Sequence, residues 1–127
     1  DFALDSKFKL DLINDVLASK EIYLGRYYIK KEKWIAAINR FKNVIENYDT
    51  TIYVEEAIHR LVEIYYRIGL VDESSKYAKL LGYNYGSSEW YKESYAIFNK
   101  DYGKLQDNVN TKKSKKGIIK SFKKLFE

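Results

Sequence analysis

The sequence predicts an all-α fold in which antiparallel helical hairpins stack into a solenoid. Three observations support this prediction. The chain of 127 residues contains no proline and only six glycines, so little in it interrupts helix formation. Apolar residues recur three and four positions apart in several segments, which is the helical period. Small and aromatic residues also return at matching intervals in two segments, as the close packing of paired helices requires.

The two segments have the spacing of a tetratricopeptide repeat, a helix-turn-helix unit that stacks on copies of itself. In the first, the pattern Leu-Gly-x2-Tyr-x8-Ala-x3-Phe runs from Leu24 to Phe41, and corresponding positions in the second run from Leu61 to Ala78. The small residues expected to let two helices approach closely are Gly25, Ala37, Ser74 and Ala78. The aromatic residues expected to fill the space beside them are Tyr28, Phe41 and Tyr65.

The first helix is expected to run from about Asp5 to Lys31, because no helix breaker precedes Gly25. Its apolar residues at helical intervals are Phe8, Leu12, Ile13, Val16, Leu17 and Leu24. At ~1.5 Å per residue such a helix is roughly 40 Å long, which exceeds the need of one repeat. We therefore expect its first half to be the second helix of a preceding repeat, with apolar residues exposed in this chain.

Three further helices follow in the hairpin pattern. The turn Lys31-Glu32-Lys33 is expected to lead into a helix over 34–47, whose inner side is made of Ile35, Ile38, Phe41, Val44 and Ile45. Thr50 or Thr51 is the expected N-cap of the next helix, which runs to Ile68 and is ended by Gly69. A fourth helix is expected from Asp72 to near Gly82.

The last helix is expected to begin after Ser87 or Ser88, to end before Gly103, and to cover the open end of the solenoid. Residues 104–127 contain eight lysines against two acidic residues, so they carry most of the net charge of +5. We expect one solenoid domain over 1–103 and a disordered basic tail over 104–127 that contains a short amphipathic helix. The tail residues expected to meet an anionic membrane surface are Lys120, Phe122, Lys123, Lys124 and Phe126. A solvated tail without a membrane contact is the alternative.

The sequence offers little for catalysis or metal binding. It contains one histidine, no cysteine, no glycine-rich phosphate loop and no HExxH motif. Acid pairs such as Asp11 with Asp15 are typical of solvated helix faces. We therefore expect a non-catalytic protein with no cofactor and no metal. Because residues 1–103 are nearly neutral, no nucleic-acid partner is expected, and binding of nucleic acid through the tail is kept only as an alternative.

A partner peptide is expected on the concave surface, which the first helix of each hairpin lines in this architecture. Counting repeat positions from Gly25 and Val62 puts these residues on this surface: Ser19, Ile22, Arg26, Ile29, Lys30, Glu56, His59, Glu63, Tyr66 and Arg67. Tyr27 is added to the expected groove, because it neighbours the core residue Tyr28 and points elsewhere. Such a strip suits a polar peptide that has aromatic anchors. For each residue the alternative is an ordinary hydrated surface position.

Several segments also carry a more specific resemblance. They are Leu10 to Ile13, Glu21 to Tyr28, Ile35 to Phe41, Val54 to Ala57, Tyr65 to Glu73 and the run Ser88-Glu89-Trp90-Tyr91. Together, over about residues 1–99, they resemble the C-terminal half of the BamD family, the tetratricopeptide lipoproteins of the bacterial outer-membrane β-barrel assembly machinery. The basic tail lies outside this resemblance.

The resemblance implies a scaffold at the periplasmic face of the outer membrane, anchored by an N-terminal lipid outside this sequence. It implies docking on the last POTRA domain of the barrel protein BamA, contact with other lipoproteins of the machinery, and recognition of the C-terminal strand of β-barrel substrates. On this basis Arg40 corresponds to an arginine that faces BamA, and Tyr27 to an aromatic implicated in substrate-strand contact. A generic tetratricopeptide adaptor that binds peptides is the alternative.

Overall fold

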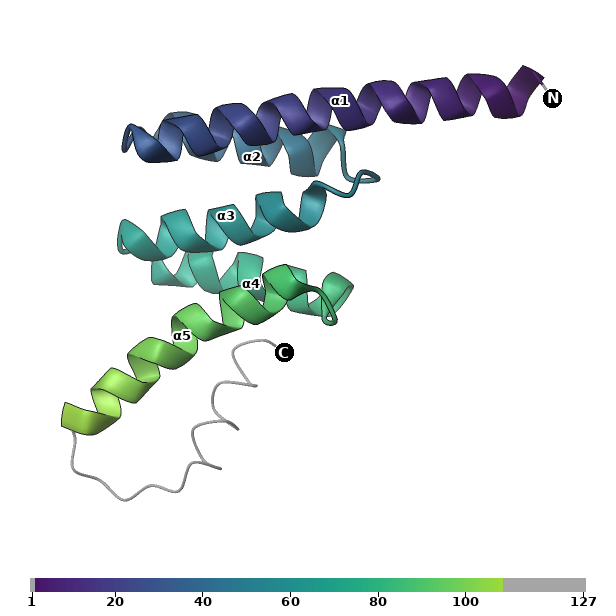
Figure 1. Cartoon of the computed structure of the whole chain (residues 1–127). Helices are drawn as coiled ribbons and strands as arrows, with labels where there is room; N and C mark the ends of the chain where they lie inside the picture. Colours follow the sequence, from purple (N-terminus) through teal and green to yellow (C-terminus); the bar gives the residue numbers. More distant parts are fainter. Residues whose placement is uncertain (1, 109–127) are drawn as a thin grey trace.

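The computed structural model describes residues 2–108, and within them the side chains of residues 2–99. This part of the chain forms five helices and no strand: α1 (Phe2–Lys30), α2 (Trp34–Asn47), α3 (Val54–Arg67), α4 (Val71–Tyr85) and α5 (Glu89–Asn108). Successive helices run antiparallel, with α1, α3 and α5 in one layer and α2 and α4 behind them (Figure 1). The predicted all-α solenoid of helical hairpins is confirmed.

The long first helix divides into an uncovered half and a packed half. The uncovered half projects beyond the rest of the stack (Figure 1), and its large apolar side chains are exposed, Phe8 at 63% and Val16 at 67%. In the second half Ala18, Ile22 and Gly25 are buried. The expectation that the first half exposes its apolar residues is confirmed.

Two hairpin turns are closed by the same pattern of backbone hydrogen bonds. After α1, the N–H of Lys33 donates to the carbonyl oxygen of Tyr28 at 2.9 Å, and after α3 the N–H of Leu70 donates to that of Tyr65 at 2.8 Å. This pattern needs a residue with positive φ just past the helix. Gly69 supplies it at φ 89° and so ends α3 as predicted, whereas Glu32 adopts φ 56° with a side chain present.

The expected cap of α3 is wrong and that of α5 is confirmed. The helix α3 begins only at Val54, and no side chain caps it. Thr51 is buried, and its hydroxyl donates to the carbonyl oxygen of Tyr48 at 2.7 Å, so it stabilises the preceding turn instead. At α5 the backbone N–H of Tyr91 donates to Ser88 Oγ at 3.0 Å, which is the geometry of an N-cap.

Two glycines expected at helix ends lie inside helices. The helix α4 continues through Gly82 to Tyr85, and α5 continues through Gly103 to Asn108. Gly82 is a packing position, because a Cβ there would lie 2.6 Å from Cε2 of Tyr91 on α5. The close approach of α4 and α5 explains why a residue of low helix propensity is used at this point.

The core confirms the predicted pairing of small and aromatic residues. Ala37, Ser74, Ala78 and Phe41 have no exposed surface, and Tyr65 is 7% exposed. The main cluster lies between α1, α2 and α3 and is completed by Ile22, Ile38, Val44, Ala57, Leu61 and Ile64.

One residue predicted for the inner side of α2 is placed wrongly. Ile35 is 77% exposed, although Ile38 and Val44 of the same predicted set are buried. The buried positions Ala37, Phe41 and Val44 follow one another at helical intervals of four and three. Ile35 stands outside this stripe, since it precedes Ala37 by two positions and therefore points to another side of the helix.

Candidate functional site

A chain of ion pairs joins α1 to α3 in the layer that contains α1, α3 and α5. Arg26 of α1 donates two hydrogen bonds to the carboxylate of Glu56 on α3: its Nε lies 2.7 Å from Oε2, and its Nη2 contacts Oε1. Arg60, one turn later on α3, donates to Glu56 at 3.2 Å and to Glu63 at 3.1 Å. Glu56 is only 5% exposed, so its charge is stabilised by the two guanidinium groups that flank it.

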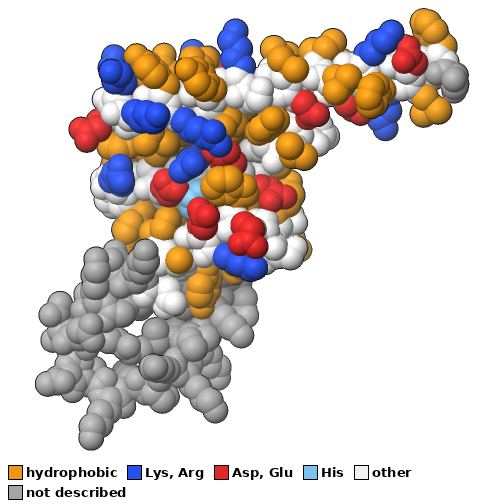
Figure 2. Space-filling model, viewed as in Figure 1, with side chains coloured by type: hydrophobic (Ala, Val, Ile, Leu, Met, Phe, Trp, Pro, Cys, Tyr) orange, Lys and Arg blue, Asp and Glu red, His pale blue; other side chains and the backbone are white. Residues whose placement is uncertain are grey.

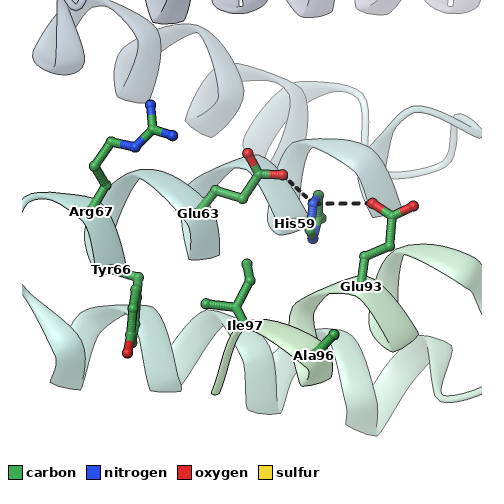
Figure 3. Close-up of a pocket in the computed structure, with 7 residues that line it drawn as sticks. All are labelled: His59, Glu63, Tyr66, Arg67, Glu93, Ala96 and Ile97. Carbon is green, nitrogen blue, oxygen red and sulfur yellow. Dashed lines mark ion pairs between the residues drawn. The ribbon is translucent and has the colours of Figure 1, made fainter. Parts of the chain in front are cut away.

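His59 extends this chain from α3 to α5. Its ring is 1% exposed, its Nδ1 lies 2.7 Å from Ser94 Oγ, and the ring packs 5.3 Å from that of Trp90. The other nitrogen, Nε2, touches the carboxylate of Glu63 and lies 3.6 Å from Glu93 Oε2 (Figure 3). Neither contact has hydrogen-bond geometry, so the buried Nε2 faces two carboxylates without a hydrogen-bond partner among the described residues.

The two carboxylates next to His59 differ in their surroundings. Burial raises the pKa of Glu63, but its contacts with His59 and Arg60 lower it further, and the net pKa lies below the ordinary value of 4.5. Glu63 is therefore ionised at neutral pH. Glu93 is 62% exposed at its side chain and reaches into the site from α5.

Next to His59 the surface is hollowed by a pocket of about 500 Å³. Its lining residues come from α3 and α5, and they are His59, Glu63, Tyr66, Arg67, Glu93, Ala96 and Ile97 (Figure 3). One end is polar and holds both carboxylates, Ala96, Ile97 and the ring of Tyr66 form an apolar wall, and Arg67 lies at the Tyr66 end (Figure 3). In the space-filling view the histidine is recessed among acidic and basic side chains (Figure 2).

The structure brings four of the predicted groove residues together in this pocket: His59, Glu63, Tyr66 and Arg67. Arg26 and Glu56 lie beside it in the ion-pair chain. Of the remaining predicted residues, Tyr27 packs edge-on against Tyr28 with ring centroids 5.7 Å apart, Ile29 packs against the main core cluster, and Lys30 is exposed.

The repeat count failed at one position and missed part of the site. Ile22, which the count placed on the concave surface, is 2% exposed and belongs to the core. The contribution of α5 was missed because that helix was interpreted only as a cover for the solenoid end. A signal was present, since Glu93, Ala96 and Ile97 are spaced by three and four residues and so share one helix face.

Arg40 lies on a different surface. Its Nη1 is 3.3 and 3.4 Å from the two carboxylate oxygens of Glu21 on α1, and its side chain is 41% exposed. It borders a second hollow of about 500 Å³ lined by Glu21, Tyr28, Ala36, Asn39, Arg40, Lys42, Asn43 and Glu46. The two hollows share no lining residue.

Several expectations concern metals, membranes and the tail. Among the described residues, no three histidine, cysteine, aspartate or glutamate side chains are grouped so that they could hold a metal ion. None of the helices in residues 2–108 combines the length and apolar composition needed to cross a bilayer. The tail residues Lys120, Phe122, Lys123, Lys124 and Phe126 lie outside the described part of the chain.

Comparisons with known proteins give a consistent result. Residues 1–80 match the family model of YfiO, described as outer membrane lipoprotein. One curated relative is the outer membrane protein assembly factor BamD of Rickettsia prowazekii, 53% identical over 96 residues that cover 76% of this chain and 38% of the relative. The BamD of Caulobacter vibrioides is 44% identical over 99 residues, which cover 78% and 32%. The chain thus spans about a third of the length of these relatives. No solved structure matches it.

Proposed function

The chain belongs to the YfiO family of outer membrane lipoproteins, and from this premise we propose that it is part of a non-catalytic scaffold for outer-membrane protein assembly. The names of its relatives support this role, since both are outer membrane protein assembly factors. The stacked hairpins also present two separate hollows, as a docking platform for more than one partner needs. We place the scaffold at the periplasmic face of the outer membrane, held by an N-terminal lipid.

We further propose that the Arg40 surface docks on the POTRA region of BamA. The observation that supports this is the way Glu21 holds the guanidinium group. Both carboxylate oxygens of Glu21 approach the same nitrogen, Nη1, and neither Nε nor Nη2 donates a hydrogen bond within the described part of the chain, so that edge can take a second carboxylate as partner. Arginine can bind two carboxylates in this way because its five donors form a planar fork. The 41% exposure of the side chain leaves it accessible to a partner.

We assign the other surface, made of α1, α3 and α5, to a peptide partner. In this proposal the partner is the C-terminal strand of a β-barrel substrate or a segment of another lipoprotein of the machinery. The pocket between α3 and α5 supports the assignment, and we add Tyr27 of α1 as a candidate anchor because 48% of it is exposed. An exposed aromatic residue of this kind can act as an anchor for an extended segment.

The docking proposal is tested by calorimetric titration of the matching BamA POTRA region into this chain. Arg40→Ala is expected to weaken binding by ~1 to 3 kcal/mol, because it removes a charged interfacial group. Lys33→Ala is the matched control, since it removes one positive charge from the exposed turn after α1 and should leave the affinity unchanged. If Arg40→Ala and Lys33→Ala bind equally well, Arg40 is not part of the interface.

A further inference from the structure

The chain of ion pairs described above ends at the pocket, where two carboxylates approach the same nitrogen of His59. From α1 towards α5 the charges alternate through Arg26, Glu56, Arg60 and Glu63, and these four compensate one another. The next group is the ring of His59, and after it comes Glu93, whose carboxylate lies 3.6 Å from Nε2. Among the described residues Glu93 forms no ion pair with a lysine or arginine, so this end of the chain places two carboxylates at the mouth of the pocket.

The pocket joins this negative end to an apolar wall. Ala96 and Ile97 stand on the same face of α5 as Glu93, and Tyr66 faces them from α3 (Figure 3). A volume of about 500 Å³ accommodates one long side chain together with part of its neighbours. Lysine and arginine match this shape, because both place a charged head on an aliphatic stem that packs against apolar surface.

The cation among the lining residues favours the same conclusion. The guanidinium group of Arg67 lies over the ring of Trp34 on α2, 5.5 Å from the ring centroid. Among the described residues no ion pair joins it to Glu63 or Glu93. An acidic ligand at this end of the pocket would be repelled by Glu63 and Glu93.

We propose that this pocket binds a partner peptide through a lysine or arginine side chain. The charged head pairs with the exposed carboxylate of Glu93, near Glu63 and His59, and the aliphatic stem packs on Ala96 and Ile97. The inference rests on the part of the proposed function that assigns the surface of α1, α3 and α5 to a peptide. It adds the chemistry of the anchoring residue, and it does not depend on Arg40.

The test uses the whole chain and three short peptides. The probe is N-acetyl-Ala-Leu-Lys-Tyr-Ala-amide, and its two twins carry norleucine or glutamate in place of lysine. Binding is followed by NMR from the backbone amide signals of Ser94, Ala96 and Ile97. The lysine peptide should shift these signals and bind about fivefold more tightly than the norleucine twin, as an exposed ion pair allows. Raising the salt concentration should remove that difference.

Two substitutions test whether the carboxylate of Glu93 binds the lysine head of the peptide. Glu93→Gln should weaken binding of the lysine peptide by about fivefold, to the level of the norleucine twin. Glu89→Gln is the matched control, because it makes the same change one turn earlier on α5, where the side chain is 81% exposed and pairs with Lys92. The control should bind like the unchanged protein.

Any of the following results would overturn the inference: equal binding of the lysine and norleucine peptides, tighter binding of the glutamate peptide, or the same affinity in Glu93→Gln and Glu89→Gln. An absence of shifts at millimolar peptide has the same meaning. These results leave the docking proposal untouched, since that depends on the Arg40→Ala titration. Conversely, an Arg40→Ala protein that binds the POTRA region normally would refute the docking proposal and leave the pocket assignment standing.

Discussion

The ring of Phe41 lies against the backbone of Gly25 so closely that no side chain fits between them. A Cβ atom on Gly25 would be 2.5 Å from Cζ of Phe41 and 2.7 and 2.9 Å from its two Cε atoms. Phe41 has no exposed surface, so its ring is enclosed on all sides. The helices α1 and α2 can approach to this distance only because one of them lacks a side chain at the contact.

Gly25→Ala is therefore expected to destabilise the protein, even though alanine favours helices over glycine by ~1 kcal/mol. Forcing a methyl group into a packed core typically costs ~1 to 3 kcal/mol, and the enclosed ring of Phe41 has no free space to move into. Urea unfolding measures the change. Lys20→Ala, at an exposed position of the same helix, should stay within ~0.5 kcal/mol of the unchanged protein. A Gly25→Ala protein as stable as that control would show that the two helices can move apart at no cost.

Phe41→Ala removes the same contact from the other side. Truncation of a fully buried phenylalanine costs ~3 to 5 kcal/mol, which is a large part of the stability of a small domain. We expect loss of helical circular dichroism at 37 °C, or a sharply reduced urea midpoint. The control is Ile35→Ala on the same helix, whose side chain is 77% exposed and whose loss should have little effect. Similar midpoints for the two variants would contradict this account of the core.

The two hairpin turns have a positive φ at equivalent positions, so introducing glycine at one and removing it at the other should change the stability in opposite directions. Glu32 adopts φ 56°, a conformation that costs an ordinary residue ~1 kcal/mol, so Glu32→Gly should stabilise the protein by about that amount. Gly69 adopts φ 89° at the equivalent position, so Gly69→Ala should destabilise it by ~1 kcal/mol. Chemical denaturation of both variants provides the measurement. If both changes shift stability in the same direction, positive φ does not determine the energetics of these turns.

The pKa of Glu63 predicts a specific acid sensitivity. Burial raises it, but contacts with His59 and Arg60 bring it below the ordinary value of 4.5 in the folded state. A carboxyl group whose pKa is lower in the folded state stabilises the fold above its unfolded pKa, and this contribution is lost as the pH falls through the folded pKa. The unchanged protein should therefore exceed Glu63→Gln in free energy of unfolding at pH 7, and the difference should shrink below pH 4.5.

Urea titrations at a series of pH values test this sign. Glu89→Gln is again the control, because its carboxylate is 81% exposed and pairs only with Lys92 among the described residues. Its difference from the unchanged protein should be small at every pH. A difference between the unchanged protein and Glu63→Gln that stays constant from pH 7 to below 4.5, or grows on acidification, is incompatible with the assigned role of Glu63.

The basic tail predicts attachment to anionic membranes. Residues 109–127 contain seven lysines and one acidic residue, and their apolar side chains include Phe122 and Phe126. Lysines near an anionic bilayer contribute ~1 kcal/mol each, and apolar side chains add to this. Deletion of 109–127, which leaves α5 complete, should reduce co-sedimentation with phosphatidylglycerol vesicles and leave the low binding to phosphatidylcholine vesicles unchanged. Equal co-sedimentation of the whole chain and the deletion variant with anionic vesicles would contradict membrane binding by the tail.

Local sequence was sufficient for most of the secondary structure. The predicted bounds of α2 coincide with the observed Trp34–Asn47, and Gly69 ends α3 as expected. These features depend on interactions within a few residues, such as helical periodicity and the ability of glycine to adopt positive φ. The same holds for the pairing of Gly25 with Phe41, because its spacing is characteristic of the repeat.

The site was only partly predictable. The repeat count found His59, Glu63, Tyr66 and Arg67 because all four lie on one helix, where the spacing in sequence determines which residues share a face. It did not include the wall that α5 contributes: spacing shows that Glu93, Ala96 and Ile97 share a face of α5, but not that this face packs against α3.

By itself the sequence determined that the chain forms helical hairpins and which small residues let them pair, since these follow from chain geometry over one or two turns. Only the tertiary structure decided that Gly82 makes room for Tyr91, that Thr51 closes a turn instead of capping a helix, and that Glu93 faces His59. Each of these outcomes is set by where neighbouring segments come to rest when the core packs. The physical reason is that steric and electrostatic contacts between helices depend on distances in space, which the order of residues along the chain does not specify.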